Sequence, residues 1–160
     1  MDRNPVAYCQ ALFIDQEGPI YASREIWGFP ATHGEPELIL GENRVAGVLD
    51  LGFGGQLRVS IPAADETAPT EAVGEPVRAA CKLIPGPDGN PVVAQLVTMQ
   101  PVDIAIKHHW RGDARLETDT ESPLDALPVV KVLSGNYTLA DMTLPSGQVA
   151  HDYLPASGKG

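Results

Sequence analysis

The stretch Arg24-Glu25-Ile26-Trp27-Gly28-Phe29-Pro30-Ala31-Thr32 is the most informative part of this sequence. Residues 20–27 predict a β-strand, and Trp27 and Phe29 are two positions apart, which places both rings on one face of an extended chain. Ligand sites are mostly apolar with a few polar groups. We therefore interpret this face as an apolar pocket wall, and simple core packing is the alternative.

Short strands are predicted along most of the remaining chain. In residues 56–61, Leu57, Val59 and Ile61 alternate with polar neighbours, which is the period of a half-buried strand. The other predicted strands are residues 6–14, 38–40, 45–51, 79–84, 92–99, 102–110, 129–133 and 137–144.

Turn signals connect several of these strands. Gly41-Glu42-Asn43 predicts one hairpin, and Asp88-Gly89 predicts another, because glycine accepts a positive φ without steric cost. A short helix is predicted at residues 123–127, with Ser122 as its N-cap. Many short strands with at most one or two short helices predict an all-β fold, an antiparallel sheet closed into a barrel.

Length and composition restrict the class of protein. The 160 residues predict a single domain over 1–154 and a disordered tail over 155–160. A net charge of −10 argues against a nucleic-acid partner, because phosphate contacts need clustered Lys and Arg. The sequence has no long apolar run and no secretory signal, so we expect no membrane association and a cytoplasmic location. Cys9 and Cys81 are expected to be free, buried thiols.

The chain resembles the acetoacetate decarboxylase family in the stretch Arg24 to Pro30 and in several further segments, which occur in the same order as in that family. They are Lys82-Leu83-Ile84-Pro85 with Asp88-Gly89 and Pro91; Trp110, Gly112, Arg115 and Leu116; Pro123-Leu124 with Leu127-Pro128-Val129; Leu139-Ala140-Asp141 with Leu144-Pro145; and Asp152-Tyr153-Leu154. The resemblance implies a β-barrel with a central pocket bordered by the segment around Phe29.

Two departures from the family pattern bear on the chemistry. Family members continue the Gly-Phe-Pro segment with two lysines, and the first forms the Schiff base with the substrate ketone; here Ala31 and Thr32 replace them. The family also carries an N-terminal portion before the segment matching residues 6–14, which supplies a pocket glutamate and an arginine. Neither a methyl group nor a hydroxyl forms an imine, so decarboxylation by the family's mechanism is not expected.

Another lysine is a possible substitute for the missing nucleophile. The sequence has only Lys82, Lys107, Lys131 and Lys159. Only a partly buried lysine is deprotonated enough to attack a ketone. Lys82 is the candidate, because the family has a lysine in the same strand.

The histidines predict no metal site. His108 and His109 are adjacent on a predicted strand and point to opposite faces, so we interpret them as a surface or interface pair. His33 lies in the segment that replaces the lysines and is a candidate acid–base group; a solvated loop histidine is the alternative. We expect no metal and no cofactor.

These observations predict an enzyme of small-molecule metabolism, secondary metabolism in particular, that works without a Schiff base. The expected reaction is a lyase, dehydration, isomerisation or cyclisation step on a carbonyl-bearing, polyketide-like substrate. The predicted catalytic residues are Thr32, His33 and Glu25. The predicted substrate-binding residues are Leu12, Arg24, Trp27, Phe29 and Ala31, with Arg24 and Glu25 alternatively forming a buried or half-buried ion pair.

Two other functions stay open at this point. One is a non-catalytic binding protein, or a partner subunit that completes the barrel of another chain; a homodimer or higher homo-oligomer would cover an exposed sheet edge equally well. The other is a decarboxylase that uses Lys82.

Overall fold

The computed structural model describes residues 6–52, 55–67, 76–119 and 128–154, and in these ranges the chain is mostly β-strand. The elements, in order, are β1 (Val6–Tyr8), β2 (Leu12–Ile14), α1 (Glu17–Ala22), the π-helical turn η1 (Ser23–Trp27), β3 (Ala31–His33), β4 (Glu35–Gly41), β5 (Arg44–Asp50), β6 (Gln56–Ile61), β7 (Asp65–Glu66), β8 (Val77–Pro85), β9 (Pro91–Met99), β10 (Val102–Gly112), β11 (Arg115–Thr118), β12 (Gly135–Thr143) and β13 (Gln148–Asp152). The predicted fold class, mostly β with at most two short helices, is confirmed.

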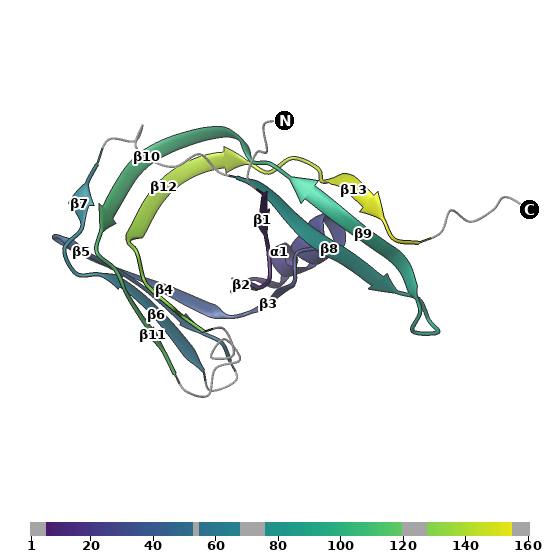
Figure 1. Cartoon of the computed structure of the whole chain (residues 1–160), viewed down its shortest axis with the longest axis horizontal. Helices are drawn as coiled ribbons and strands as arrows, with labels where there is room; N and C mark the ends of the chain where they lie inside the picture. Colours follow the sequence, from purple (N-terminus) through teal and green to yellow (C-terminus); the bar gives the residue numbers. More distant parts are fainter. Residues whose placement is uncertain (1–5, 53–54, 68–75, 120–127, 155–160) are drawn as a thin grey trace, which may run out of the picture.

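The described strands pair into four sheets, in the orders β1-β8-β9-β13, β12-β10-β7, β11-β6-β5-β4 and β2-β3. These sheets follow one another around an open centre (Figure 1). Their pairings do not close into a ring within the described residues, so the predicted barrel is present only as a curved, open arrangement. Most pairings are antiparallel, as predicted, but β1 runs parallel to β8 and β2 runs parallel to β3.

The parallel pair β2–β3 explains the largest error in the predicted strands. Residues 20–27 were expected to form a strand and instead form the end of α1 followed by η1. Parallel neighbours cannot be joined by a tight hairpin and need a crossover, which is usually helical. The segment before Gly28 is that crossover. Glu17 and Pro19 both lie in the first turn of α1, where an acidic side chain is favourable and a missing N–H is tolerated.

Other predictions can be compared element by element. The hairpin β4–β5 and the hairpin β8–β9 are confirmed, and in the second the Gly86 amide donates to the Asn90 carbonyl oxygen at 2.6 Å. The predicted strand 6–14 is split into β1 and β2. Residues 129–133 form no strand, so that prediction is wrong. The predicted helix at 123–127 falls outside the described residues.

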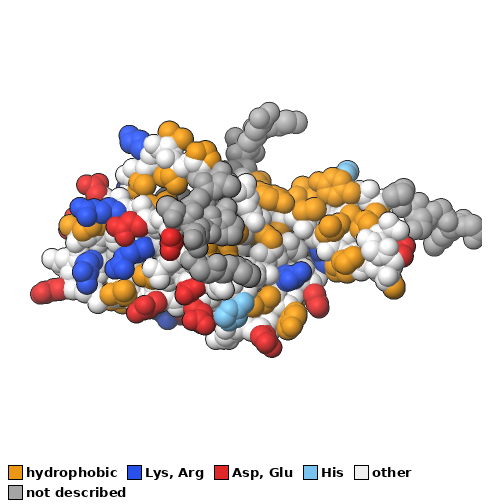
Figure 2. Space-filling view, turned by 90° about the horizontal axis from the view of Figure 1, so that it is seen from below, with side chains coloured by type: hydrophobic (Ala, Val, Ile, Leu, Met, Phe, Trp, Pro, Cys, Tyr) orange, Lys and Arg blue, Asp and Glu red, His pale blue; other side chains and the backbone are white. Residues whose placement is uncertain are grey.

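The β11-β6-β5-β4 sheet shows the alternation predicted for residues 56–61. Three of the four residues in one cross-strand row are charged, and the next row has no polar side chain; the rows are Glu117-Arg58-Val48-Glu37 and Leu116-Val59-Gly47-Leu38. Successive side chains in a strand point to opposite faces, so one face is charged and the other apolar. Acidic and basic side chains are interspersed over this end of the molecule (Figure 2).

Two small clusters of buried hydrophobic residues are found in the described part of the chain. The first joins Phe29, Ala80 and Met99, and the second joins Val45, Ile61 and Ala64. The first cluster packs η1 and the segment after it against the β8–β9 hairpin, and the second packs β5 and β6 against the β10–β12 pair. The described part of the chain contains no helix of sufficient length and apolarity to cross a membrane.

Candidate functional site

The segment that begins at Ser23 is fixed against β8 by its backbone. The amides of Gly28 and Phe29 both donate to the Ser23 carbonyl oxygen, and Gly28 adopts a φ of 75°. A Cβ atom at Gly28 would lie 2.5 Å from both Cα and Cβ of Lys82. Only glycine allows this conformation at this separation. The glycine therefore sets how closely the segment packs on the sheet.

Trp27 and Phe29 meet, but not on a strand face as predicted. Trp27 is the last residue of η1, and Phe29 follows the αL glycine. Their rings are stacked with centroids 6.1 Å apart. Phe29 is 6% exposed and belongs to the first core cluster, against which Leu12 and Trp27 pack. Three of the predicted binding residues thus lie together, in an arrangement that also serves the core.

The positions of the missing lysines lie in β3. Ala31 is 2% exposed, Thr32 is half-buried and His33 is exposed. In the parallel register with β2, Ala31 pairs with Leu12 and Thr32 pairs with Phe13. Paired residues share a face of the sheet, so the Thr32 side chain lies on the same side as that of Phe13.

The expected buried pair of Arg24 and Glu25 is not found. Both side chains are exposed on η1. Consecutive residues on a helix point in different directions, whereas the prediction assumed a strand packed on the core. Their assignment as a buried or half-buried ion pair is therefore wrong.

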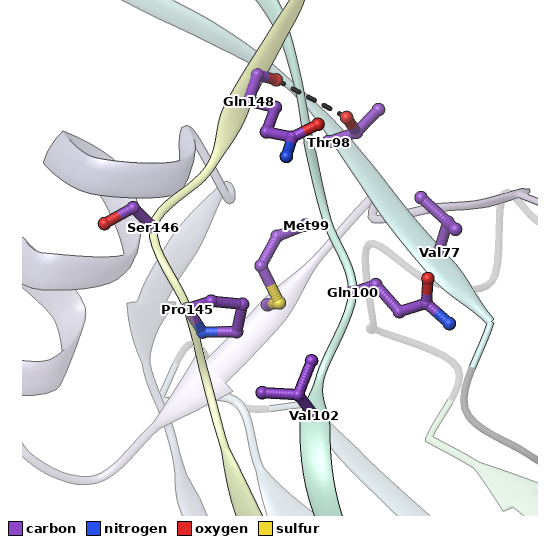
Figure 3. A pocket seen from close by; sticks show the side chains of 8 residues that line it. All are labelled: Val77, Thr98, Met99, Gln100, Val102, Pro145, Ser146 and Gln148. Atoms are coloured by element: carbon purple, nitrogen blue, oxygen red, sulfur yellow. Dashed lines mark hydrogen bonds between the residues drawn. The ribbon is translucent and has the colours of Figure 1, made fainter.

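A hollow of about 410 Å³ lies next to the first core cluster (Figure 3). It is lined by residues from the start of β8, the end of β9, the start of β10 and the β12–β13 connection: Val77, Thr98, Met99, Gln100, Val102, Pro145, Ser146 and Gln148. We call it the glutamine hollow. Met99 belongs to both the cluster and the hollow, and the Trp27 Nε1–H donates to the Pro145 carbonyl oxygen at 2.8 Å. The segment that contains Trp27 and Phe29 therefore supports one wall of this hollow.

The lining of the glutamine hollow offers hydrogen bonds but no ionisable side chain. In Figure 3 the Met99 thioether lies in the centre of the view, the Gln148 carboxamide above it, and the Gln100 carboxamide extends toward the side of Val77. The Thr98 hydroxyl donates to the Gln148 backbone oxygen at 3.4 Å. A carboxamide N–H donates to a carbonyl or an enolate oxygen, and such donors stabilise oxyanions in acyl-transfer and related sites.

The sequence analysis missed both glutamines. Gln148 lies shortly after Leu144-Pro145, a segment that already carried the family resemblance, and Gln100 precedes Pro101 at the end of β9. No sequence pattern distinguishes a glutamine that binds a ligand from one that only contacts solvent. The only available signal was that both follow predicted strands, where connecting segments often carry binding residues.

A second hollow is an open groove of about 560 Å³ along the β4–β5–β6 sheet. It is lined by Ala11, Leu12, Phe13, Pro36, Glu37, Leu38, Gly47, Val48, Leu49, Leu57 and Val59, and we call it the apolar groove. Gly47 stands in register between Leu38 and Val59, and a Cβ there would meet nothing within 4 Å. Thr32 and His33 line neither hollow.

The described lysines are distributed as follows. Lys82 is half-buried on β8 but does not line either hollow. Lys107 Nζ lies 2.7 Å from Asp141 Oδ2 in an exposed ion pair, and Lys131 is exposed. Lys159 falls outside the described residues. Lys82 as a substitute nucleophile stays a prediction.

The adjacent histidines differ in their surroundings. His108 is exposed, with Nδ1 2.9 Å from Glu66 Oε1, and its ring stacks on Trp110. His109 is 4% exposed, with Nδ1 2.8 Å from Thr138 Oγ1. The two side chains do point to opposite faces, but the surface interpretation is wrong for His109. No group of three or more His, Cys, Asp or Glu side chains suited to a metal ion occurs in the described ranges.

The two cysteines also differ from each other. Both are free; Cys9 packs against the first core cluster, and Cys81 is exposed. Burial raises the pKa of the Cys9 thiol, and the nearby positive charge of Arg78 offsets part of that rise. Cys9 is therefore the neutral apolar thiol that the sequence predicted, whereas the prediction of a buried Cys81 is wrong.

Comparison with known proteins identifies related sequences and folds. The chain is 36% identical over 154 residues to an acetoacetate decarboxylase of Chromobacterium violaceum, an alignment that covers 92% of this chain and 62% of that protein. A solved acetoacetate decarboxylase superposes with a TM-score of 0.86 at 27% identity, covering 97% of this chain and 66% of that one. The enduracididine biosynthesis enzyme MppR, solved in complex with pyruvate, shares the fold, with a TM-score of 0.71 at 22% identity over 96% of this chain and 63% of that one.

These matches extend along almost the whole chain, which spans about three fifths of the length of the curated relatives. The model of the acetoacetate decarboxylase (ADC) family matches residues 1–154. With the glycine-locked segment before Ala31 and the shared fold, this match shows that the chain belongs to the acetoacetate decarboxylase family.

Proposed function

We propose that this chain belongs to an enzyme that acts on a carbonyl-bearing small molecule without forming a Schiff base at residue 31. The observation that carries the proposal is Ala31. It stands at the family's nucleophile position, it is 2% exposed, and it offers only a methyl group. An imine requires a primary amine, and neither hollow is lined by one.

The glutamine hollow supplies a non-covalent alternative. Each of the four reaction types expected from the sequence can proceed through an enolate, in which negative charge develops on the carbonyl oxygen; in the simplest case a proton leaves the neighbouring carbon. The carboxamide N–H groups of Gln100 and Gln148 would donate to that oxygen while water accepts the proton. Loss of one such donor typically lowers the rate by about 10²- to 10³-fold. MppR, with the same fold, was solved with the carbonyl compound pyruvate.

The test of this function separates imine chemistry from enolate chemistry. We expect the protein in D₂O to exchange the methyl protons of acetone faster than buffer, as followed by ¹H NMR. Borohydride added with acetoacetate should cause no mass increase in the intact protein. Gln148→Leu and Gln100→Leu should each slow exchange by at least about tenfold. Gln56→Leu, the same change at an exposed residue of β6 outside the hollow, is the matched control and should change little.

Two results would contradict the proposal. Exchange at the buffer rate for every carbonyl probe would leave no catalytic function for the hollow. A borohydride-dependent mass increase that is lost in Lys82→Arg would instead support the decarboxylase that uses Lys82.

A second candidate function is that of a subunit that assembles with another copy of this chain. The apolar groove favours it, because Leu38 and Leu40 are 50% and 58% exposed on the same sheet face as Val59. Large exposed apolar patches mark interaction surfaces. We expect light scattering to give a dimer or higher homo-oligomer that Leu38→Lys disrupts. A monomer at all concentrations would exclude this assembly.

A further inference from the structure

The glutamine hollow differs from a site built for an organic acid. All eight of its lining residues are uncharged: two carboxamides, two hydroxyls, a thioether and three hydrocarbon side chains. Sites that bind carboxylates typically present arginine or lysine, whose charge offsets the loss of hydration when the anion enters. No cation of this kind lines the hollow.

The described residues next to the lining in sequence or register carry charges of both signs, Asp103 and Arg78, and neither lines the hollow. Asp103 directly follows the lining residue Val102, so a negatively charged side chain is adjacent in sequence to the lining; its backbone has a φ of 52°. Arg78 is paired in register with Met99 but is not a lining residue, and it has an interaction of its own. The chain as a whole carries a net charge of −10, which repels anions at long range.

We infer that the glutamine hollow binds an uncharged carbonyl compound, such as an amide, ester, lactone or ketone, and discriminates against the corresponding keto acid. The inference rests on the proposed function and names its substrate class. A neutral 1,3-dicarbonyl compound offers two acceptor oxygens, and the Gln100 and Gln148 carboxamides, one directly after β9 and one at the start of β13, each offer N–H donors. An ionised carboxylate in the same place would lose hydration without gaining a counter-charge.

Acetoacetamide and acetoacetate form a matched pair of probes, because they have nearly the same size and differ in charge. We expect acetoacetamide to bind at least tenfold more tightly at pH 7, as measured by ligand-observed NMR titration. The preference should persist in 0.5 M NaCl if it arises from local desolvation, since salt at about that concentration screens the long-range repulsion of the net charge.

Charge variants of the lining provide the sharper test. Gln148→Lys should reverse the preference toward acetoacetate, and Gln148→Glu should strengthen the preference for the amide. Gln100→Lys is the second variant if Gln148→Lys does not fold. Gln56→Lys, at an exposed residue of β6 that does not line the glutamine hollow, adds the same charge elsewhere and should leave the preference unchanged.

The outcomes separate this inference from the proposed function. If acetoacetate binds as tightly as the amide, or more tightly, while proton exchange is still catalysed, the inference is wrong and the function stands. If the amide binds preferentially but no exchange occurs, the substrate class stands and the function is wrong. If neither probe binds, both are overturned.

Discussion

Gly28→Ala is expected to destabilise the protein by more than about 3 kcal/mol, the range reached only by severe steric or packing defects. Two penalties act together. The residue has a φ of 75°, and the added Cβ would lie 2.5 Å from Cα and Cβ of Lys82, which are atoms of a paired strand and not the end of a mobile side chain. This steric overlap can be relieved only if β8 and the segment after η1 move apart. That movement would open the first core cluster.

Gly89→Ala is the matched control for this substitution. Gly89 has a φ of 81°, but a Cβ there would meet nothing within 4 Å. It should therefore show only the conformational cost, about 1–2 kcal/mol. Both free energies of unfolding can be measured by urea titration. Equal losses in the two variants would show that the contact with Lys82 is not a structural constraint.

Ala31→Lys is expected to lower stability by about 3–5 kcal/mol at pH 7 and to create an amine able to form an imine. Residue 31 is 2% exposed, and desolvation lowers the pKa of a buried lysine by up to about 3–5 units. At pH 7 the unfolded chain then binds a proton that the folded chain does not. Stability should therefore rise with pH up to the unfolded lysine pKa of about 10.4.

Ala31→Met separates charge from size. The methionine side chain has similar length without the amine, so this variant should show only overpacking, about 1–3 kcal/mol, and no pH dependence of that kind. With acetoacetate and borohydride, Ala31→Lys should gain mass and Ala31→Met should not. If Ala31→Lys is as stable as Ala31→Met at pH 7 and remains untrapped, residue 31 points to solvent and not into a ligand site.

Local patterns were sufficient for the strands that form hairpins. Alternation in residues 56–61 and the turn at Asp88-Gly89 predicted β6 and the β8–β9 hairpin, because in both cases the deciding interactions are close in sequence. The two cysteines show the limit of such reasoning. Both lie in apolar runs, yet only Cys9 packs against the core, since the side of a strand that is covered depends on distant elements.

The crossover before Gly28 shows the same limit at the candidate site. Residues 20–27 are too short and too apolar for periodicity to separate a strand from a helix. The parallel pairing of Leu12 with Ala31 decides in favour of the helix, and no local signal contains that pairing. Trp27 and Phe29 were correctly placed together, but for the wrong reason.

The sequence by itself determined the family, the predominance of β-strands and the replacement of the nucleophilic lysine by Ala31, because these depend on residue identity and short-range spacing. Only the tertiary structure decided that Arg24 and Glu25 are exposed and that Gln100 and Gln148 line one hollow. Gln148 begins β13, which pairs with β9, and Gln100 directly follows β9. Long-range strand pairing brings such residues together, and that pairing leaves no trace in the neighbouring sequence.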